Sequence, residues 1–358
     1  MNRILAVIET PISAYVLALV CDNKTEIDVI YVFNERNYNV LDVVSVCEEI
    51  LKDKNICKSV VVSDGLDWSQ GNRREIFKSI PTILEREKID YHKYKEVYAN
   101  PFTSAYGFYF STVIALSILT HGSIDYMRFY NIFYEQVKSL IKLRVWMKRP
   151  LKYYGLTDMT HPKKGYVLVS QSEAEWNFNF PGLKEYQLEE DYSKWAFCAW
   201  TEHPGYKESY SSRVITLNAQ LIKEFCHLNN TKISVLFLKV HRRSSPLLER
   251  QRKKIENGLQ EYVDKIVFFE EIIESKYSKY MPAEILIQLL NIKNVIGSDS
   301  AVPWNCASMK NVRCYSFLYL GAKEFGLLKF LSKNYINLHK LLKTKPHDFS
   351  YTIGKKLI

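Results

Sequence analysis

Several patterns that define large protein classes are absent from this sequence. The seven cysteines form no CxxC pair and no zinc-ligand spacing, which predicts reduced, buried thiols in a cytoplasmic protein rather than a disulfide framework. The longest apolar run, residues 105–119, contains Tyr, Ser and Thr and is shorter than the ~20 residues that a membrane-spanning helix needs. The first residues lead directly into a strand pattern, so we expect no cleavable signal peptide.

Motifs for common cofactors and metals are absent as well. The sequence contains no G-x-G-x-x-G, no P-loop and no Asp-x-Asp pair. We therefore expect neither metal-assisted chemistry nor a bound cofactor. Internal repeats and low-complexity tracts are also absent.

What the sequence does contain is an ordinary globular composition with an excess of basic charge. The 358 residues are 47% hydrophobic and 25% charged, as in a typical soluble globular protein, and their number predicts two domains. Lysine and arginine number 49 against 39 acidic residues, which makes a formal net charge of +10. This excess favours an anionic partner: a nucleic acid, a membrane surface, or a phosphorylated or acidic sugar substrate.

Apolar runs of strand length alternate with helical patterns along most of the chain. Strands are predicted at residues 4–8, 27–33, 59–65, 112–119, 166–169, 195–200, 233–240, 265–269, 294–297 and 312–318, and helices at 41–51, 80–88, 218–227 and 281–290. Pro11 suits the start of a further helix. Continuous apolar strands in such an alternation argue for parallel βαβ units. The predicted fold is α/β, with two Rossmann-like, doubly wound domains facing each other across a cleft.

Domain boundaries are predicted from prolines, glycines and charge. Pro150, Pro162 and Gly165 mark a linker, so we divide the chain into residues 1–155, residues 156–335 and a basic tail of residues 336–358. Residues 325–345 have the pattern of a basic amphipathic helix. Such a helix either packs on a domain or contacts an anionic membrane surface, and both interpretations stay open.

Polar residues follow the predicted strands of the second half. The set consists of Lys239, His241, Glu284, Gly297, Ser298 and Ser300. Open parallel sheets bind ligands beyond the carboxyl ends of their strands, so we expect these residues to converge. A lysine and a histidine can neutralise a phosphate, a carboxylate can accept ribose hydroxyls, and serines at a helix start can bind phosphate. A solvated basic loop, an ordinary capping acid and N-capping serines are the structural alternatives.

His121 and Gly122 follow a predicted strand of the first half. Gly122 permits a sharp turn there, and a histidine can take a proton from a sugar hydroxyl because its unperturbed pKa is about 6.5. A turn histidine without a function is the alternative, and Asp64 is a rival candidate for an acidic base. The His-Pro dipeptides at His161 and His203 do not end apolar strands and are interpreted as loops.

Three short motifs in the second half carry a family resemblance. Lys239-Val-His241, Pro282-Ala-Glu284 and Gly297-Ser-Asp-Ser300 stand in order along the chain. They resemble the Lys-x-His-Pro motif, the Pro-x-Glu helix start and the late serine pair of bacterial GT-B sialyltransferases. These are the lipooligosaccharide sialyltransferases and capsular polysialyltransferases.

Two positions depart from the pattern of that family. Arg242 replaces the proline of the Lys-x-His-Pro motif, and Thr120-His-Gly122 stands where the short acidic motif of the family is expected. The catalytic base is therefore either His121 or a carboxylate from elsewhere, with Asp64 and Asp125 as candidates.

The resemblance implies a GT-B glycosyltransferase in which residues 1–155 bind the acceptor and residues 156–335 bind the donor. The reaction would be an inverting, metal-independent transfer of sialic acid, or a related nonulosonic acid, from its CMP conjugate to a sugar hydroxyl of lipooligosaccharide or capsule. His121, beside Gly122, would deprotonate the acceptor, and His241 would assist departure of the CMP phosphate. Lys239, Ser298 and Ser300 would hold that phosphate beside Gly297, and Glu284 would hold the ribose.

The resemblance also bears on partners and location. We expect a glycan or glycolipid acceptor, no nucleic acid, and a cytoplasmic protein with peripheral contact at the anionic inner face of the membrane. A homodimer is a further option.

Two alternatives belong to other functional classes. Glycerophosphotransferases of the teichoic-acid polymerase type share a GT-B-like fold, a His-Gly base motif and a serine-rich phosphate loop, and the His121-Gly122 pair resembles theirs. A non-catalytic protein that binds nucleic acid or membrane would explain the net charge of +10 by itself.

Overall fold

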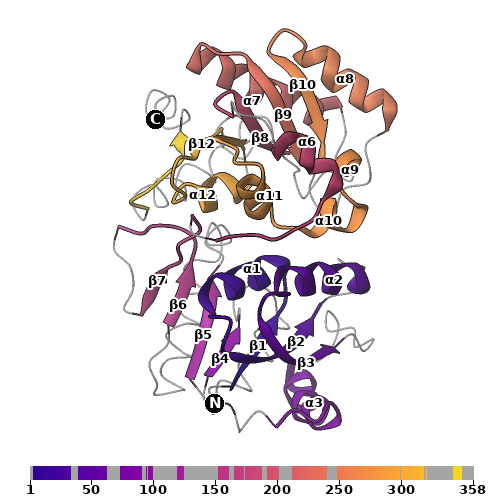
Figure 1. Cartoon of the computed structure of the whole chain (residues 1–358), viewed down its shortest axis with the longest axis vertical. Helices are drawn as coiled ribbons and strands as arrows, with labels where there is room; N and C mark the ends of the chain where they lie inside the picture. The colour runs from indigo at the N-terminus through magenta and orange to yellow at the C-terminus, as the bar shows by residue number, and fades with distance from the viewer. Residues whose placement is uncertain are drawn as a thin grey trace. The chain divides into compact units, whose positions relative to one another are not determined.

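The computed structural model describes residues 3–33, 39–62, 73–90, 94, 96–99, 119–124, 152–160, 165–172, 174–187, 192–200, 212–239, 248–298, 300–317, 320 and 342–348. The chain divides into two compact units. Unit 1 comprises residues 1–156 and 162–170, and unit 2 comprises residues 157–161 and 171–358. Each unit contains its own parallel sheet with helices beside it (Figure 1), so the predicted α/β class is confirmed.

The sheet of unit 1 has the strand order β3-β2-β1-β4-β5-β6-β7, and all of its pairs are parallel. Its elements are β1 (Arg3–Ile8), α1 (Pro11–Val20), β2 (Glu26–Val32), α2 (Val40–Ile50), β3 (Asn55–Val62), α3 (Arg73–Arg86), β4 (Glu96–Ala99), β5 (Leu119–Ile124), β6 (Lys152–Gly155) and β7 (Tyr166–Leu168). The order reverses between β1 and β4, as in doubly wound sheets of the Rossmann type.

Burial on both faces explains why the central strands of unit 1 read as continuous apolar runs. In β1, every residue after Arg3 is buried, and in β2 every residue after Glu26 is buried. Leu5 and Val7 pack with Ile80, Ile83 and Leu84 of α3, whereas α1 and α2 lie on the other side of the sheet (Figure 1). Parallel strands covered by helices on both sides need this composition.

Helix α1 begins where local chemistry favours a helix start. The hydroxyl of Thr10 caps the helix by accepting a hydrogen bond of 3.3 Å from the N–H of Ser13, and Pro11 occupies the first turn. The fixed φ of proline suits this position, and its missing N–H costs nothing there. The helix start predicted at Pro11 is confirmed.

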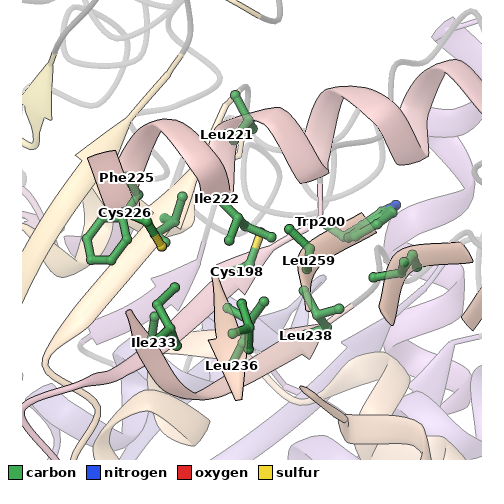
Figure 2. Close-up of a cluster of buried hydrophobic side chains, with 14 of the residues drawn as sticks. Cys198, Trp200, Leu221, Ile222, Phe225, Cys226, Ile233, Leu236, Leu238 and Leu259 are labelled. Atoms are coloured by element: carbon green, nitrogen blue, oxygen red, sulfur yellow. The ribbon is translucent and has the colours of Figure 1, made fainter. Parts of the chain in front are cut away.

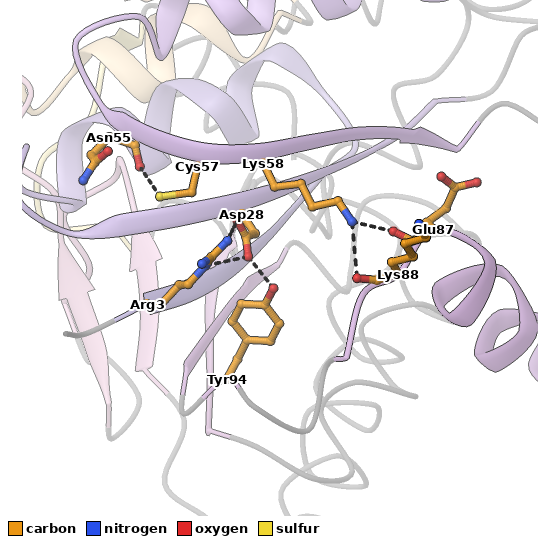
Figure 3. A network of polar contacts seen from close by, with 8 residues as sticks. All are labelled: Arg3, Asp28, Asn55, Cys57, Lys58, Glu87, Lys88 and Tyr94. Carbon is orange, nitrogen blue, oxygen red and sulfur yellow. Dashed lines mark hydrogen bonds and ion pairs between the residues drawn. The ribbon is translucent and has the colours of Figure 1, made fainter.

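A partly buried ion pair ties the first two strands together (Figure 3). Arg3 of β1 donates to Asp28 of β2, whose side chain is buried, and the hydroxyl of Tyr94 donates to the same carboxylate. Beside it, Nζ of Lys58 donates to the carbonyls of Glu87 and Lys88 at 2.5 and 3.3 Å, which fastens the end of α3 to β3. A cation suits this place because the last carbonyls of a helix are partly negative.

The sheet of unit 2 has the order β10-β9-β8-β11-β12-β13 and is also parallel. Its first elements are the 3-10 helix η3 (Pro181–Leu183), α6 (Lys184–Gln187), β8 (Trp195–Ala199), α7 (Ser212–Asn229), β9 (Ile233–Lys239), α8 (Glu249–Leu259) and β10 (Val263–Phe268). The remaining ones are α9 (Phe269–Ile272), α10 (Ser275–Tyr280), α11 (Ala283–Leu289), β11 (Asn294–Gly297), α12 (Val302–Cys306), β12 (Arg313–Ser316) and β13 (His347–Asp348).

The core of unit 2 lies between its sheet and the helices α7 and α8 (Figure 2). Ile222 and Phe225 of α7 lie toward Leu236 and other apolar side chains of the strands, and Leu221 is buried in the same cluster. Helices α11 and α12 lie on the other side of this sheet (Figure 1). Helices thus lie on both sides of this sheet, and sheets of this kind bind ligands at their carboxyl edge.

Of the strand predicted at residues 112–119, residues 112–118 lie outside the described ranges, and the observed β5 begins at Leu119. Two other predictions about secondary structure need correction. Strand β7 pairs with β6 in the sheet of unit 1, although the sequence pattern assigned it to the second half. The helix predicted at residues 325–345 does not include residues 342–345, where Leu342 instead forms a β-bridge with Met159.

Among the helices of the described ranges, none combines the length and the apolar character that crossing a membrane requires.

Candidate functional site

The second sheet changes direction between β8 and β11, and this point organises the candidate site. Strands β8, β9 and β10 follow one another outward, and β11 then adds on the opposite side of β8. Ala199 at the end of β8 pairs with Lys239 of β9 on one side and with Gly297 of β11 on the other. Lys239 and Gly297 therefore end their strands at the same level, two strands apart. Ligands of doubly wound sheets bind beyond the strands at such a point.

Lys239 brings a cation to this edge of the sheet. Its Nζ donates to the carbonyl of Ser278 and, at 3.4 Å, to that of Lys279. Both carbonyls belong to the last turn of α10, where a cation complements the helix end. Lys239 thus holds α10 against the sheet. Two residues, Met281 and Pro282, separate α10 from α11.

Glu284 lies in the first turn of α11 with only 3% of its surface exposed. Its Oε1 accepts a hydrogen bond of 2.8 Å from Nδ2 of Asn305 in α12. Burial, together with Cys314 and Glu284 nearby, raises the pKa of the Cys306 thiol well above its ordinary value. The carboxylate therefore stands in a poorly hydrated place, where hydrogen bonds to a charged group are strong.

The turn after β11 is tight because α12 lies close to the strand end. A Cβ on Gly297 would stand 2.9 Å from Cγ of Pro303, closer than atoms tolerate, so only glycine fits there. Ser298 is fully buried, and its hydroxyl donates to the carbonyl of Phe317 at 3.4 Å. Ser300 is half-buried, and its hydroxyl accepts from the N–H of Val302 at 3.3 Å. Both hydroxyls thus take part in shaping this turn.

Helix α12 brings the separate parts of the site together. It carries Pro303, which packs on Gly297, and Asn305, which binds Glu284. The structure therefore gathers Glu284, Gly297, Ser298 and Ser300 around one short helix. Lys239 reaches the same edge through α10. His241 and the neighbouring Arg242 and Arg243 lie outside the described residues.

His121 and Gly122 belong to unit 1 and lie within a strand rather than in a turn. In β5, His121 pairs with Tyr98 and Lys152, and Gly122 pairs with Ala99 and Tyr153. The prediction that Gly122 makes a sharp turn at a strand end is therefore wrong. The rival acids Asp64 and Asp125 and the histidines His161 and His203 lie outside the described residues.

The sequence analysis gave no functional role to two polar residues that the fold places at a strand end or a helix contact. Glu9 is 3% exposed and directly follows β1, the strand at which the order of the first sheet reverses. Asn305 is 5% exposed and is the one polar side chain in the helix Val302–Cys306. An acid immediately after a buried strand and an amide within an apolar helix are signals that could have identified both.

Two buried polar atoms at the carboxyl edge of the second sheet have no hydrogen-bond partner in the part of the chain that the structure describes. They are Nε1 of Trp200, directly after β8, and the hydroxyl of Ser316 at the end of β12. Buried groups of this kind are nearly always paired, so unpaired ones mark candidates for ligand contact. Across the described ranges, His, Cys, Asp and Glu form no group of three or more that could hold a metal ion.

The sequence matches no family model and no curated protein. Among solved structures, the fold is similar to that of HepE (Alr3699) from Anabaena, which was crystallised in complex with UDP and glucose. The TM-score is 0.40, with 8% sequence identity over 82% of this chain and 73% of that chain. A similarity of this size does not assign a function.

Proposed function

We propose that the chain is an inverting, metal-independent glycosyltransferase of the GT-B type. Unit 2 would bind the nucleotide of an activated sugar, and unit 1 would bind the acceptor. The observation that carries the proposal is the arrangement at the carboxyl edge of the second sheet: Lys239 and Gly297 end strands on either side of β8, and Glu284 is held beside the turn after Gly297. A cation, a tight hydroxyl-bearing turn and a carboxylate are what a phosphate joined to a ribose requires.

The roles of the residues follow from their chemistry. The Glu284 carboxylate accepts hydrogen bonds from the ribose hydroxyls. Lys239 supplies positive charge near the phosphate, and Ser300, the more exposed of the two serines, contacts it. We assign Ser298 to holding the turn in shape, because its hydroxyl is directed to the carbonyl of Phe317. His241, two residues beyond Lys239, donates a proton to the departing phosphate.

In the proposed reaction the acceptor hydroxyl attacks the anomeric carbon of the donor sugar. The bond between this carbon and the phosphate oxygen breaks, and the electron pair leaves with the nucleoside monophosphate. The proton of the acceptor hydroxyl passes to the base, for which His121 is the first candidate. One displacement inverts the anomeric configuration.

The identity of the donor rests on sequence. Lys239-Val-His241, Pro282-Ala-Glu284 and the late serine pair favour CMP-linked sialic acid or a related nonulosonic acid. The acceptor would be a sugar hydroxyl on a bacterial lipooligosaccharide or capsule. The net charge of +10 suits acidic glycans and peripheral contact with an anionic membrane.

Nucleotide release separates the candidate donors. The purified full chain is incubated with CMP-sialic acid, CDP-glycerol or UDP-glucose, each with and without a glycan acceptor, and the released nucleotide is quantified. Of the three donors, we expect only CMP-sialic acid to release its nucleotide, and we expect the acceptor to stimulate this release. Release from CDP-glycerol would instead support a glycerophosphotransferase, and the absence of any release would refute a transferase that uses these donors.

His241→Ala tests the proposed role of His241 in transfer. It should abolish transfer while circular dichroism and thermal unfolding stay unchanged, because His241 is proposed to act on the leaving group rather than on the fold. His227→Ala, at the end of α7, is the control, because Nε2 of His227 lies 3.2 Å from the hydroxyl of Tyr262 and has no role in the proposed reaction. Near wild-type activity of His241→Ala would remove His241 from the mechanism.

A further inference from the structure

Asn305 links Glu284 to a chain of hydrogen bonds that runs through unit 2. Its Nδ2 donates to Oε1 of Glu284 at 2.8 Å, and its backbone carbonyl accepts from Nε2 of Gln171 at 2.7 Å. All three residues are at most 5% exposed. Buried polar groups joined in this way hold one another in a fixed orientation, because breaking one bond leaves its partner unsatisfied.

Gln171 fastens both helices that flank the candidate site. Its Nε2 also lies 3.1 Å from the hydroxyl of Ser308, just after α12, and its backbone carbonyl accepts from Nε2 of Gln288 in α11 at 2.8 Å. Gln288 in turn accepts a hydrogen bond from the indole of Trp176. Gln171, the first residue of unit 2 after β7, thus ties α11 to α12, and Trp176 adds a further bond to α11.

The orientation of a carboxyl group is not set by its own rotamer preferences. The terminal torsion of a glutamate is broad, so a neighbouring donor decides where the two oxygens point. A carboxylate has acceptor positions for several hydrogen bonds, so the bond from Asn305 does not by itself prevent bonds from a ligand. The amide of Asn305 is placed to set the orientation of the Glu284 carboxyl group.

We infer that Asn305 is a positioning residue for nucleotide recognition and that Gln171 acts through it. Asn305 turns the Glu284 carboxylate so that it accepts the ribose hydroxyls, and Gln171 fixes the helix that carries Asn305. The inference rests on the proposed function, because it assigns the ligand of Glu284 as a ribose. It predicts that discrimination for the ribose hydroxyls depends on residues that do not touch the nucleotide.

The test compares two ligands that differ only at the ribose. Affinities of the full chain for CMP and for 2′,3′-dideoxy-CMP are measured by calorimetry for the wild type, Glu284→Gln, Asn305→Ala and Gln171→Ala. Asn305→Ala should weaken CMP binding by about ten- to a hundredfold, as expected for hydrogen bonds to a charged group, and leave dideoxy-CMP binding unchanged. Gln171→Ala should shift the preference in the same direction by a smaller factor.

Matched controls are available in and beside helix α8. Asn257→Ala and Gln260→Ala change exposed residues of the same types, and both should keep the wild-type preference for CMP. If Asn305→Ala does not fold, Asn305→Ser replaces it, since the shorter side chain no longer reaches Glu284 and the same loss is expected.

The outcomes separate the inference from the function on which it rests. Equal weakening of both ligands, or an unchanged preference, in the Asn305 variant would show that Asn305 is merely structural, while nucleotide binding would stand. If Asn305→Ala changes the preference for CMP and Gln171→Ala does not, Gln171 has no part in positioning Asn305. If the wild type binds none of CMP, UMP, AMP and GMP, the proposed donor site itself fails, and the inference fails with it.

Discussion

Arg3 and Asp28 form a two-point ion pair across the first two strands of unit 1. Nε and Nη2 of Arg3 lie 2.8 Å from different oxygens of the Asp28 carboxylate. The carboxylate is buried, with a side-chain exposure of 3%, whereas the arginine side chain is 47% exposed. The Asp28 charge is therefore buried, whereas the Arg3 charge is partly hydrated. Loss of the bonds from Arg3 would leave the Asp28 carboxylate charged in a poorly hydrated environment, which is unfavourable.

Asp28→Asn should destabilise the protein. The substitution removes the charge and turns an amide N–H₂ group toward Arg3, which has no acceptor, so we expect a loss of about 2 kcal/mol in the free energy of unfolding. Urea denaturation followed by circular dichroism measures it. Asp264→Asn is the control, because Asp264 pairs with Lys232 at the surface and should change stability by less than about 0.5 kcal/mol. Equal effects of both variants would contradict the importance of the partly buried pair.

Gly297→Ala should damage both stability and nucleotide binding. The new methyl group would meet Pro303 at 2.9 Å and push α12 away from the strand, as overpacking does, at a cost of about 1–3 kcal/mol. The effect is measured by urea denaturation together with calorimetric titration of CMP.

Gly258→Ala is the matched control for the glycine prediction. A Cβ at this position in α8 meets no atom within 4 Å, so alanine should stabilise the helix by about 0.5–1 kcal/mol. If Gly297→Ala also leaves stability and CMP affinity intact, α12 does not need the close approach to the strand.

One thiol should react much faster than the others with a thiol reagent. Cys57 is exposed, whereas the other six cysteines are buried. Burial raises the pKa of Cys21 and of Cys198 to about 12 and that of Cys226 to about 11. At pH 8 a thiol with a pKa of 12 is ionised to about one part in ten thousand, and the thiolate is the reacting form.

The measurement is a time course with an aromatic disulfide reagent at pH 8, read by absorbance. We expect one fast equivalent that disappears in Cys57→Ser, and a slow phase that accelerates in urea. Because the shifted pKa values lie above the ordinary value, raising the pH should also speed the slow phase. Several fast equivalents in the folded Cys57→Ser variant would contradict the burial of the other thiols.

The pH dependence of transfer identifies the base. If His121 takes the proton, it must be neutral, so activity should rise with pH through about 6.5 and lose this limb in His121→Ala. Residual activity that titrates with an acidic group would point to a carboxylate. Glu9, buried at the end of β1, is then the first residue of the described part of unit 1 to replace with glutamine.

The central strands of both sheets were predictable because helices cover both of their faces. The apolar runs at residues 4–8, 27–33 and 294–297 agree with β1, β2 and β11 to within one residue at each end. Edge strands do not carry this signal. In β7, Val167 and Leu168 are exposed, and nothing in three residues determines which sheet they join.

The candidate site was predictable where it depends on strand ends and not where it depends on packing. Lys239 and Gly297 end strands on either side of β8 as expected, because parallel strands share one carboxyl edge. The hydrogen bond between Glu284 and Asn305 joins residues 21 positions apart, and that between Ser298 and Phe317 joins residues 19 positions apart. A single sequence does not specify such contacts, and the roles of His121 and His241 stay predictions.

The chain passes between its two units more than once, and this interlacing has a practical consequence. Residues 157–161 belong to unit 2, where Asp158 accepts a hydrogen bond of 3.0 Å from the hydroxyl of Thr344, yet residues 162–170 return to unit 1 and supply β7. No single cut yields two intact halves. A fragment that starts at residue 171 lacks Asp158, the partner of Thr344. A fragment that ends at residue 156 lacks β7, so the edge of β6 is exposed, and exposed edge strands promote aggregation. Isolating unit 2 would require joining residues 157–161 to it rather than trimming the chain at one point.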